Sequence, residues 1–145
     1  MRRNLAGMVM AVVCSASAAF AWQEPARGSA LRAALTDAAR PHAEWLLGAP
    51  VEFVVEDMRV SGSVGFAAYL PQRPGGGQIN VSRTPMVTRD GWDPDTMDGI
   101  GIQVLYQKSG DTWVAVHWQI GATDVWYAWD AYCDTYRAVI AENCN

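Results

Sequence analysis

The stretch from residue 113 to residue 130 reads WVAVHWQIGATDVWYAWD. It holds four of the seven tryptophans of the chain and one of its two histidines. Its first eight residues fit a strand, and Gly121 then ends that strand because glycine tolerates turn conformations that other residues avoid. Thr123 or Asp124 can cap a helix that begins near Val125. The stretch therefore predicts a strand that turns directly into the last helix of the domain.

The alternation of side chains along a strand divides these first residues between two faces. One face is apolar throughout, so we expect it in the core. It consists of Val114, Val116, Trp118 and Ile120. The opposite face mixes an aromatic, a small, an imidazole and an amide side chain, so we expect it to be half-solvated or to line a groove. It consists of Trp113, Ala115, His117 and Gln119.

In the helix that follows, apolar residues recur every three or four positions, which predicts one buried stripe. These residues are Trp126, Trp129, Cys133, Tyr136 and Ile140. Asp124 suits the positive end of the helix dipole. We expect this helix to continue to about Ala141.

Near the start of the chain, the sequence predicts another helix. Ser29 can cap a helix that starts at Ala30. Pro41 interrupts the pattern because proline lacks a backbone N–H and disfavours helix at the residue before it. We expect a kink there, or a second short helix over residues 41–47 with Trp45 packed inward.

Apolar residues alternate in three further segments, which predicts strands. These segments are residues 51–60, 64–70 and 99–107. The phase of the first segment changes near Glu56, which predicts a β-bulge. A short strand is expected at residues 78–82, and residues 84–98 are expected to form a long irregular loop.

The predicted order of elements is helix, hairpin, loop, hairpin, helix. This order favours an α+β fold in which the N-terminal helix packs on a twisted antiparallel sheet of four or five strands, with a C-terminal helix. It resembles the cystatin-like or nuclear-transport-factor-like α+β roll. Three segments are also similar to those of small, uncharacterised secreted proteins of Gram-negative bacteria. These are PVEFVVEDMRV (50–60), YLPQRPGG (69–76) and IGATDVWYAW (120–129). Neither resemblance implies an activity or catalytic residues.

The first 21 residues follow the three-part pattern of a secretory signal peptide. Arg2 and Arg3 form a positive start, residues 5–13 form an apolar run, and the segment ends in an A-x-A cleavage pattern at residues 19–21. The apolar run is too short to span a bilayer. We therefore expect residues 22–145 to form a single mature domain in the periplasm or outside the cell.

Removal of the signal peptide deletes two arginines and no acidic residue, which changes the formal net charge from −4 to about −6. An acidic chain without a basic cluster argues against nucleic acid and against an anionic membrane surface as partners. No apolar stretch of the mature chain is long enough to span a membrane. Cys133 and Cys144 are its two cysteines, and in an oxidising compartment we expect them to form a disulfide.

Residues 90–98 carry four aspartates in nine positions. From Asp93 to Gly99 the spacing D-x-D-x-x-D-G is near that of an EF-hand calcium loop, but the glycine is displaced and Val104 stands where the closing glutamate belongs. We expect a solvated acidic loop and neither a metal nor a cofactor.

The chain lacks the G-x-S-x-G and H-E-x-x-H motifs, and it lacks a glycine-rich loop followed by Lys-Ser or Lys-Thr. The surplus of aromatic side chains near the strand–helix junction favours a non-catalytic binding module for a protein, as in an inhibitor, or for a small molecule. The candidate binding residues are Trp113, His117, Asp124 and Trp126. Two alternatives remain open. The first is a small hydrolase or isomerase that uses His117 with a nearby aspartate (Asp124, Asp130 or Asp134). The second is a structural component of an envelope complex.

Overall fold

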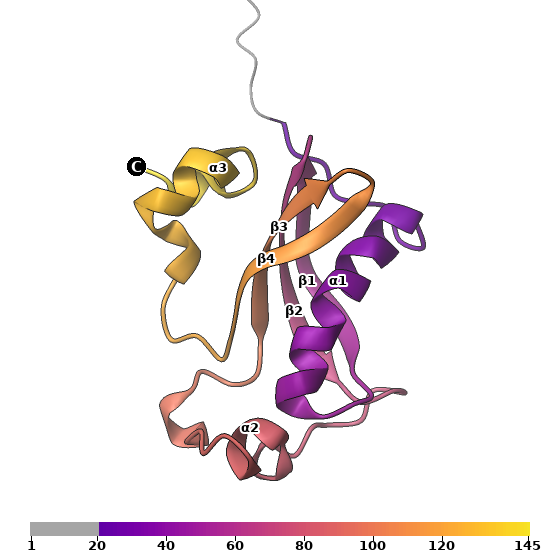
Figure 1. Cartoon of the computed structure of the whole chain (residues 1–145), viewed down its shortest axis with the longest axis vertical. Coiled ribbons are helices and arrows are strands. Elements are labelled where there is room, and N and C mark those ends of the chain that lie inside the picture. Colours follow the sequence, from indigo (N-terminus) through magenta and orange to yellow (C-terminus); the bar gives the residue numbers. More distant parts are fainter. Residues whose placement is uncertain (1–20) are drawn as a thin grey trace, which may run out of the picture.

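The computed structural model describes residues 21–145, so the predicted signal peptide lies outside the described residues except for Ala21 (Figure 1). Two main helices, α1 (Ala30–Leu47) and α3 (Asp130–Ile140), accompany one four-stranded sheet. Its strands are β1 (Glu52–Ser61), β2 (Val64–Gln72), β3 (Ile102–Ser109) and β4 (Thr112–Ile120). All neighbours are antiparallel in the order β1-β2-β3-β4, so β1 and β4 are the edge strands. The predicted α+β fold is confirmed.

The sheet lies between α1 and α3, which cover opposite faces (Figure 1). Successive residues of β2 belong to two separate cores because their side chains alternate. Ala67 and Tyr69 pack in the larger core beneath α1, whereas Phe66 packs with Leu105 and the buried side of α3. The edge strand β4 belongs to the sheet that separates the two cores, and the chain continues from its end into the segment that carries α3.

Local sequence signals set both ends of α1. The Ser29 side chain accepts a hydrogen bond from the Arg32 N–H at 3.2 Å, and Gly48 ends the helix with φ 78°. The helix continues through Pro41, so the alternative of a second helix is wrong. Pro41 lies on the exposed side of α1, where water can satisfy the carbonyl that the missing N–H leaves free. Trp45 is 65% exposed rather than packed inward.

Two bulges shape the edge strands. The bulge predicted near Glu56 is confirmed by a register shift between Val55 and Asp57. A second bulge, at Val116 in β4, was not predicted. One extra residue in a strand reverses the alternation of all residues on one side of it.

The β4 bulge makes the predicted faces wrong for the first half of that strand. Trp113 is 8% exposed and lies with Ala115 in the core beneath α1, whereas Val114 is 42% exposed and Val116 is also exposed. After the bulge, Ile120 is in the core as predicted.

The connections differ from prediction in three places. Residues 78–82 form no strand, and a 3₁₀ turn covers Val81–Arg83. The short helix α2 (Pro85–Thr88) lies inside the predicted irregular loop, where Met86 is fully buried. The last helix begins at Asp130, after a 3₁₀ turn at Trp126–Ala128, and not near Val125.

The predicted disulfide is present and joins Cys133 of α3 to Cys144 in the C-terminal tail. Among residues 21–145, no helix has both the length and the apolar character that a membrane span needs.

The core beneath α1 contains one pair of phenol groups. The hydroxyl oxygens of Tyr69 and Tyr106 lie 2.8 Å apart, and both side chains are fully buried. Burial raises the pKa of each phenol, so both stay protonated where an exposed tyrosine ionises. The pair therefore satisfies two polar groups that water cannot reach.

We expect Tyr69→Phe to lower the free energy of unfolding by about 2 kcal/mol, because it leaves the Tyr106 hydroxyl buried without its partner. Tyr69→Phe with Tyr106→Phe should cost less than the sum of the single changes. Tyr136→Phe is the control, because the buried Tyr136 hydroxyl has no hydrogen-bond partner in the described part of the chain. Urea unfolding measures the free energies for Tyr69→Phe, Tyr106→Phe, the double variant and Tyr136→Phe. If Tyr69→Phe lowers the free energy of unfolding no more than Tyr136→Phe does, the expectation is contradicted.

The same pair predicts a loss of stability at high pH. The phenols of the unfolded chain ionise near pH 10, whereas those of the folded protein remain protonated. The contribution of the pair to the free energy of unfolding is therefore complete below pH 10 and falls as the pH rises above it. The double phenylalanine variant should show a shallower fall between pH 10 and pH 12.

Candidate functional site

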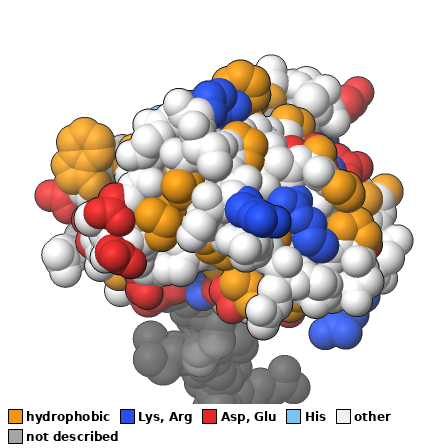
Figure 2. Space-filling view, turned by 90° about the horizontal axis from the view of Figure 1, so that it is seen from below, with side chains coloured by type: hydrophobic (Ala, Val, Ile, Leu, Met, Phe, Trp, Pro, Cys, Tyr) orange, Lys and Arg blue, Asp and Glu red, His pale blue; other side chains and the backbone are white. Residues whose placement is uncertain are grey.

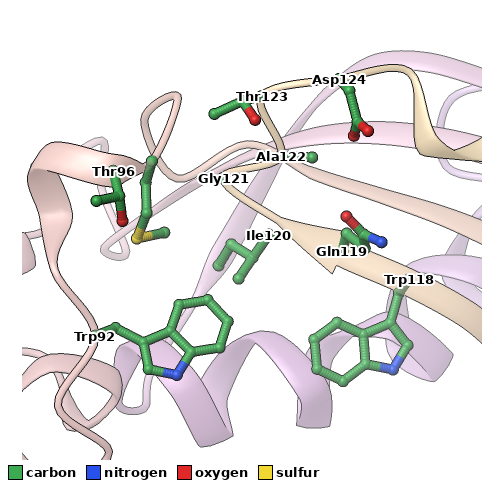
Figure 3. Close-up of a pocket in the computed structure, with 10 residues that line it drawn as sticks. Trp92, Thr96, Trp118, Gln119, Ile120, Gly121, Ala122, Thr123 and Asp124 are labelled. Carbon is green, nitrogen blue, oxygen red and sulfur yellow. The ribbon is translucent and has the colours of Figure 1, made fainter.

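A pocket of about 470 Å³ lies at the end of β4 (Figure 3). The loop before β3 contributes Trp92, Thr96 and Met97 to its lining. The end of β4 and the segment after it contribute residues 118–124. The pocket is thus formed by two segments that are far apart in the sequence.

The pocket has one aromatic side and one polar side. The indoles of Trp92 and Trp118 lie along the same side, with Ile120 between them, whereas Thr123 and Asp124 lie opposite (Figure 3). Trp92 is 40% exposed, so part of its ring remains open to a ligand. This combination of apolar surface and a few polar groups is typical of small-molecule sites.

The position of Trp118 is set by α1. Its ring stacks on His42 with the centroids 4.8 Å apart and the planes 26° from parallel. Partial burial lowers the pKa of His42, so the imidazole stays neutral at a lower pH than a free histidine. The stack fixes one indole of the pocket against a rigid helix.

The position of the loop is set by Gly121. Its backbone has φ 62°, and its carbonyl accepts a hydrogen bond from the Asp98 N–H at 3.0 Å. Its own N–H donates to the Gly101 carbonyl at 2.8 Å. A Cβ at this position would lie only 2.9 Å from the backbone carbonyl oxygen of Gly99, and it would also meet the flexible end of the Met97 side chain. The absence of a side chain at residue 121 therefore allows the loop to close on the strand end.

A second hollow, of about 500 Å³, lies on the α3 side of β4. It shares Gln119 and Asp124 with the first pocket. Its aromatic lining comes from Trp126, Trp129 and Tyr132. Trp129 is 64% exposed, against the prediction that it belongs to the buried stripe of the helix. The two hollows thus meet at one amide and one carboxylate.

Two of the four predicted binding residues line these hollows and two do not. Asp124 lines both, and Trp126 lines the second while its indole N–H donates to the Gln103 side chain at 3.4 Å. Trp113 lies in the core beneath α1. His117 packs against Tyr132 on the α3 side, with ring centroids 4.7 Å apart.

Trp92 and Trp118 are pocket residues that the sequence did not indicate as a site. Trp118 fell on the face predicted to be core. Trp92 stands in a loop that read as acidic and solvated. The one signal available was an isolated tryptophan in a segment rich in Asp and Gly, where no apolar stripe requires an aromatic side chain.

Two features of the sequence could carry chemistry, His117 and the acidic loop at residues 90–98. His117 forms no hydrogen bond or ion pair with a carboxylate in the described structure, so none of the three candidate aspartates serves it as a partner. Within residues 21–145, no group of three or more His, Cys, Asp and Glu side chains is placed to hold a metal ion. The acidic loop instead bonds to itself, since the Asp93 carboxylate accepts the Asp95 N–H at 3.0 Å.

Comparison of the chain with models of protein families, with curated proteins and with solved structures found no match. The resemblance to the cystatin-like or nuclear-transport-factor-like roll stays a prediction.

Proposed function

We propose that the mature chain is a secreted or periplasmic binding module without catalytic activity, and that its ligand occupies the pocket between Trp92 and Trp118. The observation that carries this proposal is the exposed indole of Trp92 and the partly buried indole of Trp118 on one side of a pocket whose opposite side is polar. Aromatic rings offer a large contact area at a small cost in conformational entropy. The disulfide between Cys133 and Cys144 supports an oxidising compartment.

A small molecule fits this site better than a protein does. The volume of the pocket lies within the range of small-molecule sites, and its lining comes from both the loop before β3 and the end of β4. No Lys or Arg lines the pocket, so it offers no countercharge to a phosphate or carboxylate. The ligand class that this lining supports is neutral or cationic.

A thermal-shift screen of residues 22–145 tests the proposal, with neutral monosaccharides and disaccharides, amino acids and organic cations as probes. For any probe that stabilises the protein, we expect Trp92→Ala and Trp118→Ala each to weaken binding about tenfold or more, because each removes an aromatic wall. Intrinsic tryptophan fluorescence gives the affinities.

Trp45→Ala is the matched control, because Trp45 is exposed and lies outside the pocket, stacked under Arg89. It should bind each probe as the wild type does. A probe whose affinity is unchanged in both pocket variants would place its site elsewhere, and a screen without any stabilising probe would count against a small-molecule site.

A further inference from the structure

We propose that the ligand of this pocket is an organic cation with alkyl groups on its charged nitrogen, held by the Asp124 carboxylate and the neighbouring indoles together. The inference rests on the proposed function and adds the chemical class of the ligand. Three observations carry it: the charge of the lining, the aromatic rings without a cation, and the geometry of Asp124.

The charge of the lining is entirely negative. Three hollows share Asp124, and the third, of about 260 Å³, adds Asp98. No Lys, Arg or His side chain lines any of the three. Figure 2 shows acidic and hydrophobic side chains side by side on the left, the side on which α3, the segment before it and the loop before β3 lie in Figure 1. A net negative chain adds a field that attracts cations.

The exposed tryptophans of the protein fall into two groups. Trp22 and Trp45 each already have a guanidinium over the ring, from Arg59 at 5.0 Å and Arg89 at 4.0 Å. Trp92 and Trp129 have no such partner among residues 21–145. The face of an indole is negative and attracts cations. The two exposed rings that lack a guanidinium are thus those that line the hollows around Asp124, whereas the Trp118 ring of the same pocket stacks on the His42 imidazole.

The Asp124 carboxylate faces the pocket, and no side chain of the described residues competes with a cationic ligand for it. Its side chain forms no ion pair or hydrogen bond within the described chain. It lies across the pocket from the indole of Trp118, near the Gln119 amide (Figure 3). A hydrated metal ion would need several oxygen ligands, whereas alkyl groups on nitrogen suit the apolar contacts of Trp118 and Ile120.

Choline and its neutral isostere 3,3-dimethylbutan-1-ol are the probes, because they share a shape and differ by one positive charge. Titration by calorimetry and by tryptophan fluorescence at low salt should show choline binding about tenfold more tightly than the isostere. Asp124→Asn should remove this difference, and higher salt should reduce it. Asp111→Asn is the control, because Asp111 is an exposed aspartate in the β3–β4 turn outside the hollows.

The outcomes separate this inference from the proposed function. If the two probes bind with equal affinity and Trp118→Ala abolishes the binding of both, the inference of a cationic ligand is overturned, but the pocket stands as a binding site. No binding of choline at millimolar concentration would also overturn the cation, and a neutral probe from the thermal-shift screen that depends on Trp92 would still uphold the pocket. Choline binding that neither Trp92→Ala nor Trp118→Ala affects would overturn both.

Discussion

Replacing Gly121 by alanine is expected to lower the free energy of unfolding by about 3 kcal/mol and to displace the loop that closes the pocket. The positive φ of 62° costs a non-glycine residue roughly 1–2 kcal/mol. The new Cβ would also lie 2.9 Å from the Gly99 carbonyl oxygen, a backbone atom that cannot turn away as the end of the Met97 side chain can. Such overpacking costs about 1–3 kcal/mol, and it acts on the loop that carries Trp92.

Gly110→Ala is the matched control for this variant. Gly110 has nearly the same φ, 58°, but a Cβ there would meet nothing within 4 Å. It should therefore show the cost of the backbone conformation alone. Urea unfolding compares the two variants, and the fluorescence of Trp92 and Trp118 should change in Gly121→Ala only. Equal losses of stability would show that the loop does not depend on the close contact at Gly121.

Reduction of the disulfide is expected to lower the free energy of unfolding by roughly 2.5–3 kcal/mol, the chain-entropy value for a short loop. Cys133 and Cys144 lie 11 positions apart in the sequence, so the crosslink restricts the conformations of the unfolded chain near its C-terminus. The C-terminal segment also holds the Arg59 side chain of β1, which donates hydrogen bonds to the Glu142 carboxylate and the Val139 carbonyl. The last turn of α3 should exchange its amide hydrogens faster once the crosslink is removed.

Urea unfolding with and without reductant measures the effect of the disulfide. Cys144→Ser is the companion variant, because it removes the crosslink and keeps the buried Cys133 side chain. It should match the reduced wild type in both conditions. Equal unfolding midpoints for the oxidised and reduced wild type would contradict the expected contribution.

Features that depend on neighbours in the sequence were predictable. Ser29 caps the start of α1 and Gly48 ends it. Both effects involve only residues within one turn of the helix, so they can be predicted from the local sequence. The strands and the bulge near Glu56 followed from alternation and its change of phase. The disulfide followed from the two cysteines that remain when the predicted signal peptide is left out.

Features that depend on contacts between distant segments were not predictable. The bulge at Val116 lies in a run where residues 113–116 are all apolar, so either face could have been buried. Trp45 was expected to pack inward because it lies among the apolar residues of the helix. In the structure its ring lies at the surface, where Arg89 from the distant α2 segment packs over it. In both cases the local pattern allowed two arrangements, and tertiary packing selected one.

The sequence by itself determined the fold class, the ends of α1, the positions of the four strands of the sheet, the disulfide, and the strand–helix junction as a concentration of aromatic residues. Only the tertiary structure decided which of these residues line a pocket. Trp92 reaches Trp118 because the loop that carries it is hydrogen-bonded to Gly121 at the end of β4. A sequence pattern reports periodicity within one segment, whereas a pocket requires two segments at a fixed distance, and that distance is set by packing and hydrogen bonds between them.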